Sequence, residues 1–154
     1  MYMLKTNEIL HVDSESFFNN LVDNIAYDVF NATGENIPLS SIKKGFNYKK
    51  NLNNKLGRKG TVNVEIIEFN KPISYSAKFQ SSSGVNTLSY YIEALDKNSI
   101  NVTYIEDFKG SKGSMDLNYK LLNIFFKRNA KKRIIHFLHS MEESIIDNKN
   151  SLSS

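Results

Sequence analysis

The chain has 154 residues, of which 40% are hydrophobic and 23% are charged. This balance is typical of a globular protein, and the length predicts one domain with a sizeable core. The absence of cysteine excludes a disulfide framework, a thiolate metal site and a cysteine nucleophile. Because that composition fits a reducing compartment, we expect a cytoplasmic protein. No apolar run approaches the roughly 18 residues of a membrane span, and the first residues lack the pattern of a signal peptide.

The net charge of +4 comes almost entirely from lysine. Only three of the 20 basic residues are arginine, namely Arg58, Arg128 and Arg133. Arginine is the residue that base recognition and two-pronged phosphate binding favour. The basic charge is therefore weak evidence for a nucleic-acid partner, and we expect none.

The first elements are predicted to be a strand and a helix. Residues 2–11 form an extended candidate, and Asp13 or Ser14 is suited to cap a helix that begins there. Gly34 is suited to end this helix in the left-handed conformation. One helical face is apolar between these limits, through Phe18, Leu21, Val22, Ile25 and Val29.

From residue 45 to residue 108 the apolar period changes from 3.6 to 2. Five segments alternate between apolar and polar side chains, and connections near residues 70–72, 81–85 and 96–98 are short enough for hairpins. This pattern predicts an antiparallel meander with one covered face and one wet face. The covered face should include Tyr48, Val62, Val64, Ile66, Ile73, Tyr75, Ala77, Phe79, Leu88, Tyr90, Ile92, Ala94, Ile100, Val102, Tyr104 and Phe108.

Residues 116–147 return to helical spacing, without an internal proline or glycine. At about 1.5 Å per residue, such a helix would be on the order of 45 Å long. We expect a single domain over residues 1–148 and a disordered tail over residues 149–154. The predicted apolar stripe of this helix contains Leu122, Phe126, Ala130, Ile134, Phe137, Leu138, Met141 and Ile145.

These elements predict an α+β fold with the order β-α-β-β-β-β-β-α. A sheet with one apolar face needs a cover, and the C-terminal helix carries a matching stripe. The sequence therefore predicts a curved antiparallel sheet of about six strands that grips the long C-terminal helix.

The element order and the opening "HVDSESFFNNLVD", residues 11–23, resemble the helix-grip superfamily, also called the START-like or Bet v 1-like (SRPBCC) fold. Within it, the segments "YDVFNATG", "GFNYKK" and "FFKRNAKKR" resemble an uncharacterised family of Gram-positive bacteria, which has no assigned activity. Members of the superfamily commonly hold lipids, hormones or other apolar ligands between sheet and helix. The resemblance thus implies the fold over nearly the whole chain, and it leaves function open because this fold hosts many functions.

Several tyrosines fall in phase with the covered sheet face. An apolar cavity with a few hydroxyl groups is typical of small-molecule sites. The alternative is that these tyrosines are core residues whose hydroxyls reach a partner or the rim. Lys50 and Glu68 share the inward phase, as does Glu106, which could orient a ligand or pair at the rim. The predicted cavity lining is Tyr48, Tyr75, Phe79, Tyr90, Tyr104, Glu106 and Phe126.

The leading hypothesis is a non-catalytic domain that binds a small apolar or lipid-like ligand between the sheet and the C-terminal helix. No Ser-His-Asp arrangement or phosphate-binding glycine loop is evident, and no cofactor is expected. An enzyme that acts on a small apolar substrate, with Glu106 or a tyrosine as acid or base, is an alternative.

The start of the C-terminal helix predicts an interaction patch. Leu121, Ile124 and Phe125 project away from the stripe that faces the sheet. They are expected to pack under the first helix or the loop over residues 34–45, to form a homodimer contact, or to touch an anionic membrane surface beside the neighbouring lysines. A further alternative for the function is therefore a protein-interaction or membrane-surface module that uses this patch.

The segment "HFLHSMEE" brings two histidines and a glutamate onto one helix. His136, His139 and Glu143 could contribute to a zinc site, but a third element would have to supply another ligand. We expect instead an exposed helical pair between His139 and Glu143, and no bound metal.

Overall fold

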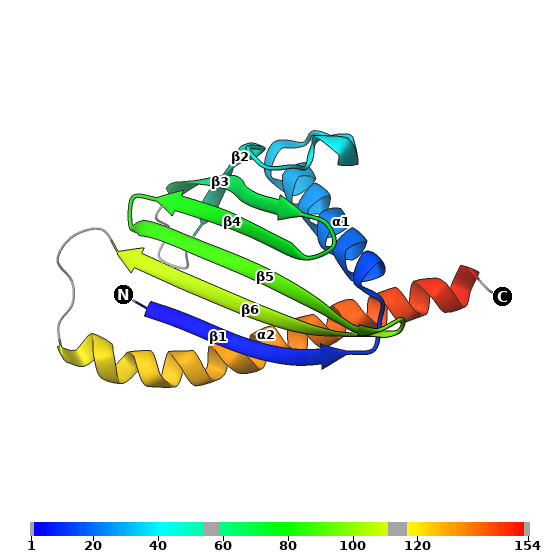
Figure 1. Cartoon of the computed structure of the whole chain (residues 1–154). Coiled ribbons are helices and arrows are strands. Elements are labelled where there is room, and N and C mark those ends of the chain that lie inside the picture. The colour runs from blue at the N-terminus through cyan, green and yellow to red at the C-terminus, as the bar shows by residue number, and fades with distance from the viewer. Residues whose placement is uncertain (1, 54–58, 111–116, 153–154) are drawn as a thin grey trace.

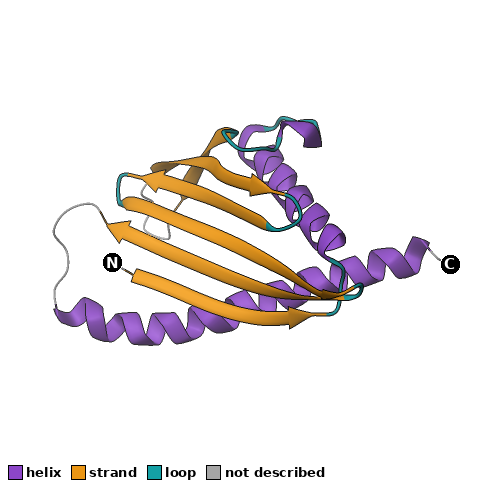
Figure 2. Ribbon diagram, in the orientation of Figure 1, coloured by secondary structure: helices purple, strands orange, loops and turns teal. Residues whose placement is uncertain are grey.

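The computed structural model describes residues 2–53, 59–110 and 117–152, and within them it leaves aside the side chains of residues 2, 52–53, 59 and 117–128. The elements follow the predicted order (Figures 1 and 2). They are β1 (Tyr2–Leu10), α1 (Ser14–Thr33), the short 3-10 helix η1 (Leu39–Ser41), β2 (Asn47–Asn53), β3 (Lys59–Asn70), β4 (Ser74–Ser81), β5 (Gly84–Asp96), β6 (Ser99–Gly110) and α2 (Leu117–Leu152).

All six strands belong to one antiparallel sheet in the order β1-β6-β5-β4-β3-β2. Strands β2 to β6 form the predicted meander. Strand β1 pairs with β6 and forms one edge of the sheet. Leu10 faces Ile100 and Leu4 faces Glu106 in this register. The helices lie behind the sheet in Figure 1, on one side of it. The predicted fold class is confirmed.

Helix α1 begins and ends where the sequence predicts. The Asp13 side chain caps it, because its Oδ2 accepts a hydrogen bond from the Ser16 backbone N–H at 2.9 Å. Gly34 ends it with a φ of 77°, and the Gly34 N–H donates to the Phe30 carbonyl at 2.8 Å. Glycine adopts this left-handed conformation without steric strain, because it has no Cβ.

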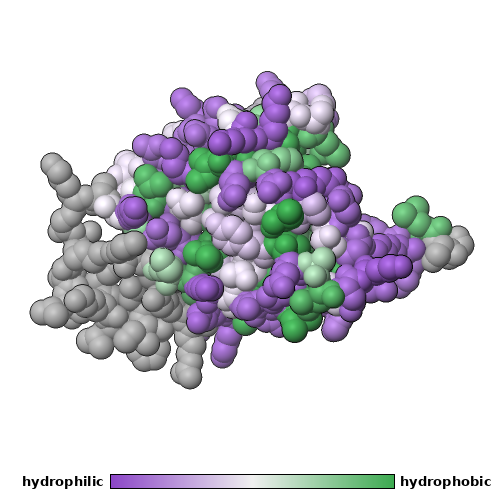
Figure 3. Space-filling view, in the orientation of Figure 1, coloured by the Kyte–Doolittle hydropathy of each residue, from purple (hydrophilic) through white to green (hydrophobic). Residues whose placement is uncertain are grey.

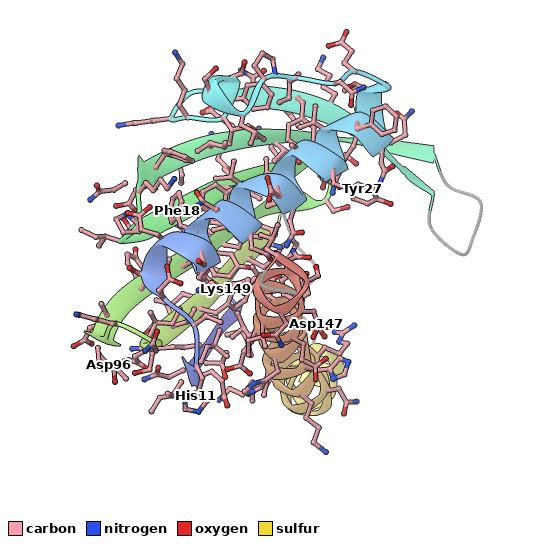
Figure 4. All side chains as sticks on the ribbon, turned by 90° about the vertical axis from the view of Figure 1, so that its right-hand side faces the viewer. His11, Phe18, Tyr27, Asp96, Asp147 and Lys149 are labelled. Atoms are coloured by element: carbon pink, nitrogen blue, oxygen red, sulfur yellow. The ribbon has the colours of Figure 1, made fainter. Side chains whose placement is uncertain are left out.

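Helix α1 covers more of the sheet than the sequence indicated. Phe17 and Phe18 are both fully buried. Phe17 lies 6.3 Å from the Tyr90 ring, and Phe18 meets Phe69 edge to face at 5.2 Å. In Figure 4, α1 crosses the sheet with Phe18 on its sheet side, while the exposed Tyr27 projects away. The core therefore has two helical covers, with Leu138, Met141 and Ile145 of α2 beside the α1 residues.

Helix α2 continues to Leu152, so residues 149–152 are helical where the sequence placed a disordered tail. Lys149 supports this extension, because its Nζ lies 2.5 Å from Asp13 Oδ1 at the start of α1. A cation also suits the last turn of a helix. The side chain of Phe137 differs from the prediction too, since it is 46% exposed rather than part of the inward stripe.

The outer face of the sheet mixes polar and isolated apolar side chains. Figure 3 views this face, and its apolar spots are separated by hydrophilic groups. Met3, Ile9 and Tyr91 are among the exposed apolar residues. Among the described residues, no helix is long and apolar enough to cross a membrane.

A bulge in β3 overturns the inward position predicted for Glu68. The register shifts between Ile66, which faces Ala77, and Glu68, which faces Ser76. The extra residue moves Glu68 to the outer face. There its carboxylate accepts hydrogen bonds from Ser74 Oγ at 3.1 Å and from Ser76 Oγ at 3.2 Å. The alternation of inward and outward side chains therefore changes phase at the bulge, and the phase before it does not predict the face of Glu68.

Candidate functional site: a groove at one end of the covered face

Three tyrosines from neighbouring strands cross the covered face side by side. Tyr75 of β4 faces Tyr90 of β5, which faces Tyr104 of β6. Their ring centroids are 6.2 and 5.1 Å apart, and all three residues are buried. Burial raises the pKa of Tyr75 and of Tyr90 above the ordinary value, so both hydroxyls stay protonated at neutral pH. This tyrosine ladder divides the covered face into two halves.

The closed half lies on the side of the ladder where β1 ends and β6 begins. Ile100 and Val102 of β6 and Leu10 of β1 are fully buried there. They belong to the same cluster as Phe17 of α1 and Leu138 of α2, so both helices pack onto this half. The closed half is a filled core.

The groove lies on the other side of the ladder, where β4 turns into β5. It has a volume of about 290 Å³, and its described lining residues all occupy inward-phase positions of strands β2 to β6. Gly84 is required in its wall, because a Cβ there would approach the Lys109 carbonyl oxygen to 2.3 Å. The lining residues are Lys50, Val62, Phe79, Ser81, Gly84, Asn86 and Phe108.

One polar cluster at the groove centres on Asp28 of α1. The Tyr48 hydroxyl donates to Asp28 Oδ2, and Lys50 Nζ lies 3.2 Å from the same oxygen. Lys50 Nζ also lies 5.6 Å from the centre of the Phe79 ring. Burial, the hydrogen bond to Asp28 and the charge of Asp28 raise the pKa of Tyr48, so it remains a hydroxyl donor. Lys50, the cation among the described lining residues, is therefore already paired.

A second polar cluster centres on Glu106. Its Oε1 accepts a hydrogen bond from Asn86 Nδ2 at 2.8 Å, and its Oε2 accepts one from the Tyr104 hydroxyl at 3.2 Å. The other amide atom of Asn86, Oδ1, is buried and has no hydrogen-bond partner among the described residues. Such a buried acceptor is uncommon and calls for an explanation.

The predicted lining residues are distributed between the ladder and the groove. Phe79 lines the groove, Tyr48 shares the Asp28 carboxylate with the groove residue Lys50, and Glu106 accepts a hydrogen bond from the groove residue Asn86. Their roles in binding a ligand stay predictions. Tyr75, Tyr90 and Tyr104 form the ladder. The side chains of Phe126 and of the predicted patch, Leu121, Ile124 and Phe125, lie outside the described residues.

The sequence did not single out Asn86 or Asp28. Asn86 precedes Leu88 by two residues, so the strand alternation already placed it on the inward face and could have identified it. Asp28 is joined to Lys50 across 22 residues by chain folding. No local pattern could have indicated that contact.

A second groove lies outside the sheet, between α1, η1 and the β3–β4 turn. It encloses about 650 Å³, and Lys43, Lys71 and Asp23 contribute charges to it. Lys71 is already engaged, because its Nζ lies 2.5 Å from Asn19 Oδ1 and 3.7 Å from Glu15 Oε2. This outer groove is larger than the inner one and equally open to solvent, and charged side chains lie at its rim.

The helical pair predicted between His139 and Glu143 is wrong, because His139 has other carboxylate partners. The Nδ1 atom of His139 lies 3.0 Å from Oε1 of Glu142, and not beside Glu143. The Nε2 atom of His139 lies 3.0 Å from Oε1 of Glu8 on β1. Glu142 in turn accepts the His11 backbone N–H at 2.5 Å. Hydrogen bonds to Glu142 and Glu8 raise the pKa of His139. This His139 clamp ties α2 to β1, and the described residues hold no group of three acidic or histidine side chains placed to bind a metal.

Comparison with solved structures supports the architecture. A START superfamily protein from Mycobacterium smegmatis is 11% identical, with 96% of this chain and 99% of that chain covered and a TM-score of 0.61. Ara h 8.0201 is 12% identical, with 95% and 98% covered and a TM-score of 0.62. A protein of unknown function from Staphylococcus aureus is 9% identical, with 97% and 95% covered and a TM-score of 0.65. At these identities the likeness shows the fold alone, and it confirms the START-like and Bet v 1-like helix-grip fold.

Sequence comparison identifies the family. The search of curated proteins found no match. The model of the family described as "Domain of unknown function (DUF3284)" matches residues 4–127, which is most of the chain. The chain therefore belongs to the DUF3284 family.

Proposed function

We propose that this protein is a non-catalytic binding domain for a small apolar or lipid-like ligand, held in the groove on the covered face of the sheet. The observation that carries the proposal is the contrast across the tyrosine ladder. On one side, both helices fill the covered face with buried side chains. On the other side, the same face is hollow and offers Val62, Phe79 and Phe108 to a guest.

The chemistry of the groove supports binding rather than catalysis. Small-molecule sites are mostly apolar, with a few fixed polar groups that orient the ligand. Lys50 is held by Asp28, and Glu106 is held by Asn86 and Tyr104. These groups have fixed partners, which suits orientation of a ligand. None of them forms the paired nucleophile and base that covalent catalysis needs.

Ser81→Trp tests the proposal by filling the groove from its rim. Ser81 lines the groove at the end of β4, and a tryptophan there would occupy the space of a ligand. Thr61→Trp is the matched control, because Thr61 is an exposed strand residue of the outward phase. The chain has no tryptophan of its own, so each variant also carries a single fluorescent reporter.

Native mass spectrometry and solvent extraction of the purified proteins give the readout. The natural chain and Thr61→Trp are expected to retain an apolar ligand, or to take up the dye Nile red once delipidated. Ser81→Trp is expected to do neither while it unfolds at a similar temperature. Equal retention by all three proteins, or no binding by any of them, would refute the proposal.

A further inference from the structure

We infer that the groove selects a neutral amphipathic ligand whose polar end is a hydrogen-bond acceptor, such as a ketone or ester carbonyl, bound by the ammonium group of Lys50. This inference rests on the proposed function and names the chemical class of the ligand. It follows from the position of Lys50 in the groove, from the donors of its ammonium group and from the charges beside it.

The groove has a charged end and an apolar end. Its described lining crosses the sheet from Lys50 on the edge strand β2 to Phe108 on β6. Lys50 is paired with Val62 of β3, and both residues line the groove. The ammonium group itself lies at the groove wall, because Lys50 Nζ is 5.6 Å from the centre of the ring of Phe79, another lining residue. An amphipathic ligand would therefore place its polar end at Lys50 and its apolar part toward Phe108.

The ion pair with Asp28 does not use all the donors of Lys50. A lysine ammonium group has three N–H donors. Among the described residues, its acceptors are the two carboxylate oxygens of Asp28, at 3.2 and 3.4 Å from Nζ. One carboxylate can engage at most two of the three donors, so at least one N–H is left for a ligand. The Lys50 side chain is 27% exposed, so a ligand in the groove can reach it.

The other polar side chains of the described lining are weaker candidates for this contact. Ser81 Oγ accepts the Ser83 backbone N–H at 3.2 Å and lies 3.5 Å from the Gly84 carbonyl oxygen. Asn86 Nδ2 donates to Glu106 at 2.8 Å. Both are neutral groups, and a charged donor forms a hydrogen bond roughly twice as strong as a neutral one. Lys50 is therefore the group that should determine the polar end of the ligand.

The charges around Lys50 favour a neutral acceptor over an anion. Asp28 pairs with Lys50, and Glu106 lies beside the lining residue Asn86. The described groups that line the groove or bond to its lining thus carry one positive and two negative charges. A ligand carboxylate would be brought toward like charges, which costs free energy. A carbonyl oxygen accepts a hydrogen bond from the ammonium group without adding a charge.

Two probes of the same shape test the contact with Lys50 in the full, delipidated chain. In 2-undecanone a carbonyl oxygen replaces the terminal CH₂ group of 2-methyl-1-undecene, so only the ketone accepts a hydrogen bond. Each probe displaces Nile red at pH 7.5 and is compared with itself across variants, so differences in solubility cancel. Lys50→Met removes the ammonium group and keeps an unbranched side chain. It should weaken binding of the ketone about tenfold, as expected for one hydrogen bond to a charged group, and binding of the alkene about twofold or less.

Lys49→Met is the matched control, because Lys49 is the neighbouring residue of β2, exposed and of the outward phase. It should change the binding of neither probe. Equal losses of the two probes in Lys50→Met, or no loss of the ketone, overturn this inference and leave the proposed function intact. If neither the dye nor any probe binds the natural chain, the proposed function fails as well.

Asp28→Asn tests the charge argument separately, and it does not require Lys50→Met to fold. The new amide keeps an acceptor for Lys50 but removes a negative charge. Binding of decanoate should therefore strengthen about tenfold, while binding of 2-undecanone changes little. In the natural chain, 2-undecanone should bind more tightly than decanoate. Tighter binding of decanoate by the natural chain, or no gain for decanoate in Asp28→Asn, overturns the selection of a neutral ligand.

Discussion

The two halves of the covered face belong to one sheet and follow the same alternation, yet one is a core and the other is a groove. On the closed half, branched aliphatic residues such as Ile100 and Val102 meet Phe17 of α1 and Leu138 of α2. In the groove, the corresponding positions hold Gly84, Ser81 and Asn86. The difference shows that alternation defines which face is covered, whereas side-chain size and the position of the helices decide whether that face is filled.

Truncation of one phenylalanine in each half should give the largest difference. Phe17 is completely buried in the closed half, so Phe17→Ala should lower the free energy of unfolding by about 3–5 kcal/mol. Phe79 borders open space in the groove, so Phe79→Ala should cost roughly 1 kcal/mol or less, because it creates little new cavity. Urea unfolding followed by circular dichroism measures both. Equal losses would mean that the groove is packed like the closed half.

Removal of single tyrosine hydroxyls should give an intermediate effect. Tyr48→Phe deletes the donor to Asp28 and should cost about 1 kcal/mol, reduced by the partial exposure of Asp28. Tyr75→Phe is a matched control, because the Tyr75 hydroxyl has no hydrogen bond to another described residue. Tyr75→Phe should leave the free energy of unfolding nearly unchanged. A larger loss for Tyr75→Phe than for Tyr48→Phe in the same unfolding assay would contradict this assignment.

The His139 clamp should give the smallest effect, and only in one range of pH. The pKa of His139 is raised in the folded state, so the clamp contributes its full stability below the unfolded pKa of 6.5 and loses it as pH rises through the folded pKa. His139→Gln should therefore lower the Tm more at pH 6 than at pH 8.5, by roughly 2 °C, since the imidazole is well exposed.

Comparison with His136→Gln isolates this effect, because His136 is exposed and its ring forms no hydrogen bond with another described residue. Differential scanning fluorimetry at several pH values provides the measurement. A His139→Gln defect that is constant with pH, or that grows toward pH 8.5, would exclude a protonated clamp.

The fold could be predicted because its signals are local. The period of 2 in the strands, the Asp13 cap and the Gly34 stop each depend on a few neighbouring residues. The errors came from features that are not local. The bulge after Ile66 moved Glu68 to the outer face, and chain folding chose Glu142 and Glu8 as the partners of His139.

The candidate site was predictable only in part, for the same reason. Strand alternation placed Phe79 and Glu106 on the covered face, and both lie at or beside the groove. It could not separate the two halves, because that separation depends on where α1 crosses the sheet. Three of the predicted tyrosines consequently form the buried ladder between the halves.

Mapping of amide chemical shifts by NMR tests the central claim most directly. Titration of the delipidated chain with 1-decanol should perturb the amides of Val62, Phe79 and Asn86 while those of Ile100 and Val102 stay unchanged. This result would assign binding to the groove. Shifts confined to the outer groove, near residues 39–43, or shifts of equal size in the closed half would contradict the account.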